Sequence, residues 1–77
     1  MELKLLIVED DRLLAEAVSD YFTGKSWETD VVYDGDSAVE NAERKSYQMI
    51  LLDVMLPGRD GFSVCRKIRE MTETPVF

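Results

Sequence analysis

The sequence predicts an α/β protein built on a doubly wound parallel sheet. Apolar runs that read as strands alternate with segments of helical period, in the order β-α-β-α-β-α and then the start of a further strand. Two of the runs, residues 3–8 and 49–52, are nearly continuous, which is typical of parallel strands covered on both faces. Right-handed crossovers would place helices on both sides of the sheet. We therefore expect the first three βα units and the start of strand 4, in one domain over residues 1–77.

The first two units are marked by apolar spacing and by their ends. The strand at 3–8 is interrupted only by Lys4, and the residues after it recur at the helical period: Leu13, Leu14, Ala17, Val18, Tyr21 and Phe22. Asp10 or Asp11 stands where an N-cap is needed, and Gly24 is expected to end this helix. A second strand is expected at 28–33.

The following turn, 34–37, carries Asp36, which is expected to cap the second helix. That helix should bury Ala38, Val39 and Ala42. The third strand, 49–52, ends at Asp53, and the Pro and Gly residues of 56–61 indicate a loop.

A third helix is indicated by apolar residues spaced three apart: Phe62, Cys65, Ile68 and Met71. Cys65 is expected to be a buried structural thiol. Residues 74–77 would begin the fourth strand.

Composition narrows the class of function. The 77 residues suffice for one small domain, and a net charge of -7 from 16 acidic and 9 basic residues argues against direct binding of nucleic acid or an anionic membrane. A single cysteine excludes an internal disulfide, and no run approaches the ~20 apolar residues of a membrane span. The N-terminus does not read as a signal peptide. A cytoplasmic protein is the simplest expectation.

Carboxylates follow two of the predicted strands. Glu9, Asp10 and Asp11 come directly after the first, and Asp53 comes directly after the third. The carboxyl ends of parallel strands share one edge, and ligands bind there at the point where the winding direction reverses. If the first strand is central, Asp10 and Asp53 are neighbours. Clustered like charges destabilise a fold unless a cation sits among them.

Mg²⁺ is the cation that best suits this set. The chain has no histidine and one cysteine, so the ligands would be oxygens, which a hard ion prefers. Asp10 and Asp53 would supply carboxylates, the backbone carbonyl of Met55 a third oxygen, and Glu9 would hold a metal-bound water. A cation there would also let Asp53 accept a phosphoryl group. For Asp11, and secondarily for Asp10, a helix-capping role is the alternative.

Two other phosphate chemistries fit poorly. The "GKS" at 24–26 lacks the glycine that a P-loop requires five positions before Gly24, where Ser19 stands, and it follows a helix rather than a strand. A magnesium-dependent phosphatase of the haloacid-dehalogenase type needs Asp-x-Asp, but Met55 stands at the second position.

Four segments together resemble the receiver domain of bacterial two-component response regulators: "LLIVEDDRLLAEAV", "VVYDGDSAVENA", "MILLDVMLPGRDGFSVCRKIR" and "TPVF". The resemblance covers nearly the whole chain, and it is nearest to the receivers of winged-helix transcriptional regulators. It implies the strand order 2-1-3. It also implies that Asp53 is the phosphoacceptor of a sensor histidine kinase, with Asp10 bound directly to Mg²⁺, Glu9 bound through water and Met55 bound by its carbonyl.

The same resemblance implies a signalling module that is not itself an enzyme and that reaches DNA only through a separate output domain. Family receivers are longer and carry a Ser/Thr after strand 4 and a Lys after strand 5, which would both lie beyond Phe77. The chain is therefore expected to be the N-terminal part of a receiver domain. The alternative is a truncated, non-phosphorylated receiver that acts as a protein-interaction module. Self-association is expected through an open edge at 49–52 and 74–77.

Overall fold

The computed structural model describes residues 3–53, 56 and 60–77. Three strands and three helices alternate along the chain. They are β1 (Lys4–Val8), α1 (Arg12–Thr23), β2 (Glu28–Val32), α2 (Gly35–Arg44), β3 (Met49–Leu52) and α3 (Gly61–Met71). No helix in this part of the chain is long and apolar enough to cross a membrane.

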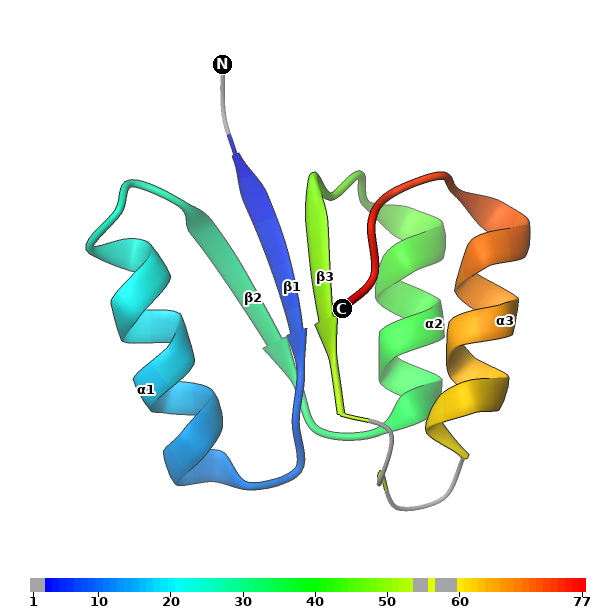
Figure 1. Ribbon diagram of the computed structural model, residues 1–77, viewed down its shortest axis with the longest axis horizontal. Helices are drawn as coiled ribbons and strands as arrows, with labels where there is room; N and C mark the ends of the chain where they lie inside the picture. Colours follow the sequence, from blue (N-terminus) through cyan, green and yellow to red (C-terminus); the bar gives the residue numbers. More distant parts are fainter. Residues whose placement is uncertain (1–2, 54–55, 57–59) are drawn as a thin grey trace.

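The three strands form one parallel sheet in the order β2-β1-β3. Leu5 of the central strand pairs with Thr29 on one side and with Met49 on the other. Helix α1 covers one face of the sheet, and α2 and α3 lie together on the other (Figure 1). The predicted doubly wound sheet and its strand order are confirmed.

The core lies mainly between the sheet and the α2–α3 layer. Leu6, Ile50, Val64 and Ile68 are all at most 1% exposed there. Leu5 and Ile7, which point to the opposite face of β1, are also buried. Burial on both faces explains why β1 reads as a continuous apolar run.

Each helix begins at an aspartate. Asp11 caps α1 by accepting hydrogen bonds from the N–H groups of Leu13 and Leu14, at 3.1 and 3.2 Å. Asp34 caps α2 by accepting from the N–H of Ser37 at 2.8 Å. The prediction that Asp36 caps α2 is therefore wrong: Asp34 keeps the extended backbone of an N-cap, and Asp36 already lies in the first helical turn. Asp60 caps α3 in the same way.

The inward face of α3 differs from the predicted one. Gly61, Val64 and Ile68 are buried, whereas Phe62 is 62% exposed. Cys65 is half-buried, so the expectation of a buried thiol is wrong. It follows Val64 by one position, which turns it about 100° away from the core-facing stripe.

The end of the chain lies against β3. The N–H groups of Ile50 and Leu52 donate to the carbonyls of Pro75 and Phe77 at 3.0 and 2.7 Å, and the N–H of Phe77 donates to the carbonyl of Ile50 at 2.9 Å. Val76 forms a parallel bridge with Ile50, as the predicted start of a fourth strand requires. The expectation that 49–52 has an open edge is wrong at Ile50 and Leu52, because residues 75–77 already pair there.

A polar cluster joins β2 to the chain before β3. The hydroxyl of Tyr47, which is buried, donates to the carboxylate of Asp30 at 2.6 Å. The Lys45 ammonium pairs with the same carboxylate oxygen at 3.1 Å. Tyr47 is the first cause, and Lys45 a smaller one, of a lowered pKa for Asp30, whose partial burial acts in the opposite direction.

Candidate functional site

Backbone hydrogen bonds continue past the strand ends and hold the acidic residues at one edge of the sheet. The N–H of Asp53 donates to the carbonyl of Val8 at 3.0 Å, and the N–H of Glu9 donates to the carbonyl of Val32 at 3.1 Å. Glu9 and Asp53 thus stand directly beyond neighbouring parallel strands, β1 and β3. The backbone hydrogen bonds of the sheet therefore fix the positions of both residues at this edge.

Three of the predicted residues come together there. Glu9, Asp10 and Asp53 each present a carboxylate oxygen, and these oxygens all lie within 4.8 Å of one another. Glu9 and Asp53 are half-buried, and Asp10 is exposed. The predicted convergence of carboxylates at the carboxyl edge is therefore present.

Asp11 has a different role from Asp10. Its side chain is the N-cap of α1, and its backbone N–H donates to Oε2 of Glu9 at 3.1 Å. The capping alternative that the sequence left open thus belongs to Asp11. Asp10 is left to face the other two carboxylates.

The environment of Glu9 disfavours its charged form. Burial raises the pKa of this carboxyl, and the neighbouring carboxylates of Asp53 and Asp10 raise it further, while the hydrogen bond from the N–H of Asp11 acts in the opposite direction. A bound cation would relieve both the burial and the repulsion. The raised pKa of Glu9 therefore indicates that the cluster favours a positive charge beside it.

The donor set fits a hard divalent cation. Every donor is a carboxylate oxygen, which is what Mg²⁺ binds in proteins. Two oxygens on opposite sides of one Mg²⁺ ion are about 4.2 Å apart, so small side-chain rotations would let Asp10 and Asp53 share one ion, with Glu9 close enough to hold a water bound to it. Met55, which was expected to add a backbone carbonyl, lies outside the described residues.

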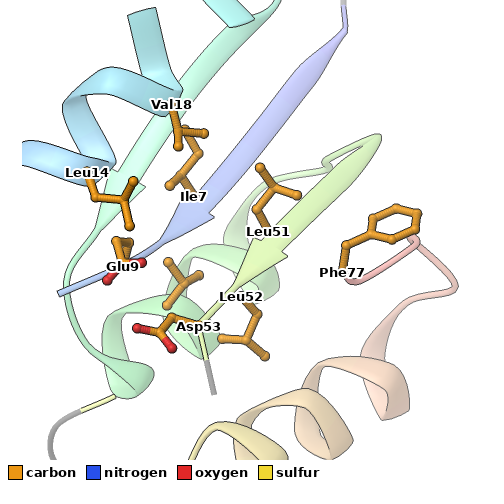
Figure 2. A pocket seen from close by; sticks show the side chains of 9 residues that line it. Ile7, Glu9, Leu14, Val18, Leu51, Leu52, Asp53 and Phe77 are labelled. Carbon is orange, nitrogen blue, oxygen red and sulfur yellow. The ribbon is translucent and has the colours of Figure 1, made fainter. Parts of the chain in front are cut away.

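A pocket of about 300 Å³ opens beside the acids, between α1, β1 and β3. Glu9 and Asp53 lie at one end of it, and Ile7, Val18 and Leu51 line its apolar part (Figure 2). Sequence reasoning missed this pocket. The only available signal was that the apolar positions of the first helix outnumber those that one narrow face can bury.

A parallel sheet that brings carboxylates of two neighbouring strands to its carboxyl edge defines the class of the protein: a small doubly wound α/β domain with a candidate cation site at that edge. Residues 5–77 match the family model described as the response regulator receiver domain. The chain belongs to this family, the receiver domains of two-component response regulators.

Curated relatives extend well beyond the matched region. The transcriptional regulatory protein DltR of Streptococcus agalactiae is 40% identical over 76 residues, which are 97% of this chain and 34% of that protein. The regulatory protein ResD of Bacillus subtilis is 37% identical over 76 residues, 99% of this chain and 32% of that protein. The chain thus spans about a third of the length of these relatives, which are transcriptional regulators.

Solved receiver domains share the fold. The receiver domain of the Francisella response regulator 1452 superposes with a TM-score of 0.91 at 30% identity, covering 97% of this chain and 63% of that one. The receiver domain of the sensor histidine kinase PA1611 from Pseudomonas aeruginosa gives 0.92 at 32% identity, covering 99% and 65%. The latter structure has a magnesium ion coordinated in its active site cleft.

Proposed function

We propose that this chain is the phosphoacceptor module of a cytoplasmic two-component response regulator. A sensor histidine kinase would transfer a phosphoryl group to Asp53, and the resulting acyl phosphate would control an output domain that regulates transcription. The convergence of Glu9, Asp10 and Asp53 within 4.8 Å carries the proposal. The family match and the transcriptional regulators among the relatives support it.

Each acid has a separate task in this proposal. An oxygen of Asp53 attacks phosphorus, the bond from phosphorus to the kinase histidine breaks, and its electron pair stays on the imidazole nitrogen. Asp10 and Asp53 would bind Mg²⁺ directly, Glu9 through water, and Met55 by its carbonyl. When bound, Mg²⁺ supplies the positive charge that lets an anionic phosphoryl group approach these carboxylates. The chain is then a substrate of the kinase rather than an enzyme.

Intact-mass spectrometry after incubation of the intact protein with acetyl phosphate and MgCl₂ tests this assignment. The wild type should gain the mass of one phosphoryl group, and Asp53→Asn should gain none. Asp11→Asn is the matched control: it makes the same substitution in a neighbouring carboxylate that serves as a helix cap, and most of the adduct should remain. An adduct on Asp53→Asn would place the nucleophile elsewhere. No adduct on the wild type would favour the interaction-module alternative.

We also propose that copies of this chain self-associate through the edge formed by β3 and residues 75–77. Apolar exposure supports the proposal, because Phe77 is 70% exposed beside the apolar pocket. Light scattering over a range of concentrations tests it: the mean mass should rise with concentration and fall back in Phe77→Ser. A monomer at every concentration would contradict it.

A further inference from the structure

One basic side chain stands among the acids of the carboxyl edge. Arg12 is the first residue of α1, and its guanidinium carbon lies 3.9 Å from the ring centroid of Tyr33, the residue that follows β2. This cation–π contact ties the start of α1 to the turn that leads into α2. Arg12 is exposed and Tyr33 is half-buried.

The other basic residues that the structure describes lie elsewhere. Lys4 and Lys45 stand at the amino ends of β1 and β3, and the rest are placed in the middle or at the far ends of helices: Lys25, Arg44, Arg66, Lys67 and Arg69. Within residues 3–53, 56 and 60–77, Arg12 is therefore the cation at the edge that holds Asp10 and Asp53.

Helix stability does not explain this placement. A cation in the first turn of a helix opposes the helix dipole, which favours acidic residues there. Arg12 also makes no ion pair with a described carboxylate, although Asp10 and Asp11 directly precede it. A guanidinium stacked on a ring keeps the N–H groups at its edge available to an anion.

The position suits an anion that approaches Asp53. Neighbouring strands lie about 4.8 Å apart, and β2 is two strands from β3, so Arg12 on Tyr33 stands on the order of 10 Å from the Asp53 carboxylate. That is about one Debye length at 0.1 M salt. At this distance the charge of Arg12 attracts an anionic phosphodonor although the side chain does not contact the reacting atoms.

We propose that Arg12, held on the ring of Tyr33, is a specificity-determining residue that favours phosphodonors of higher negative charge. The inference rests on the proposed phosphorylation of Asp53. The step itself is unchanged: a carboxylate oxygen of Asp53 bonds to phosphorus, the bond from phosphorus to the leaving group breaks, and the electron pair leaves with that group. Arg12 offsets the repulsion between the acidic cluster and the incoming donor, and Tyr33 positions Arg12.

The test compares the rate of Asp53 phosphorylation in the intact protein by acetyl phosphate, a dianion, and by phosphoramidate, a monoanion. At about 10 Å in water, loss of the Arg12 charge should slow acetyl phosphate about fourfold at low ionic strength and phosphoramidate about twofold. Arg12→Gln should show these losses. Arg12→Glu changes the charge by two units rather than one, so each rate should fall by roughly the square of the factor for Arg12→Gln. Both effects should shrink as salt rises past 0.1 M.

Further variants separate charge from structure. Arg12→Lys should restore most of the rate, and Tyr33→Leu should lose part of it while it keeps the charge. Arg66→Gln is the matched control, since it removes an exposed cation from the middle of α3. Equal slowing of both donors with no dependence on salt, or wild-type rates in Arg12→Glu, would overturn this inference alone. A wild type that neither donor phosphorylates would overturn the proposed function and this inference with it.

Discussion

Replacing Asp10 by asparagine should stabilise the protein without metal, because it removes one of three clustered negative charges. Unit charges 4.8 Å apart, the outer limit for these oxygens, repel by about 0.9 kcal/mol in water. The dielectric of water applies because Asp10 is exposed. Asp10 has two such neighbours, Glu9 and Asp53, and salt near 0.1 M removes roughly 40% of the repulsion. We expect a gain of about 1 kcal/mol, or about 4–8 °C in Tm for a domain of this size.

Mg²⁺ should reverse the order of the Tm values of the wild type and Asp10→Asn. A ligand at ten times its Kd stabilises the folded state by about 1.4 kcal/mol, and the order reverses because Asp10→Asn, with one ligand fewer, should keep less than about 0.4 kcal/mol of this gain. Thermal unfolding in EDTA and in rising MgCl₂ measures both effects. Asp20→Asn is the control, because it removes one exposed negative charge near the other end of α1. Equal Tm values for wild type and Asp10→Asn in EDTA, or equal responses to Mg²⁺, would refute the reasoning.

Three further predictions concern the rest of the fold. The hydrogen bond from Tyr47 lowers the pKa of Asp30, so its contribution is complete above the unfolded pKa of about 3.8 and is lost as the pH falls through the lower folded pKa. Tyr47→Phe should therefore cost about 1.5 kcal/mol at neutral pH and less in acid, as measured by urea unfolding at several pH values. Ser26 has a φ of 69°. Urea unfolding should therefore give Ser26→Gly a free energy of unfolding about 0.5 kcal/mol above that of the wild type, and Ser26→Val one below it. Ile68→Ala, in the core, should cost about 2–5 kcal/mol, whereas Phe62→Ala on the surface should cost under about 1 kcal/mol in the same assay.

The sheet and the convergence of acids could be predicted from the sequence because both follow from burial. A central parallel strand is covered on two faces, so β1 and β3 stand out as apolar runs, and the residues after them must meet at one edge. The prediction that Glu9 and Asp53 meet did not depend on side-chain packing. It followed from the pairing of neighbouring parallel strands.

Choices between adjacent acids could not be predicted in the same way. Asp34 and Asp36 both suit an N-cap, and the choice depends on which residue keeps an extended backbone. Asp10 and Asp11 differ by one position, and only the direction of the helix start decides which of them caps. The contact between Arg12 and Tyr33 joins two turns that strand order alone makes neighbours. The role of Met55 stays a prediction.

The pairing of β1 with β3 has a consequence for the order of folding events. Leu6 pairs with Ile50 across the sheet, and the N–H of Lys4 donates to the side chain of Gln48, 44 positions along the chain. Contacts between such distant residues form late, because closing the long loop costs entropy before any contact compensates for it. During synthesis β1 must wait, unpaired on that side, until β3 has left the ribosome. The acidic cluster assembles only when β1 and β3 have paired, so a cation that binds it should recognise the folded domain and slow its unfolding rather than speed its folding.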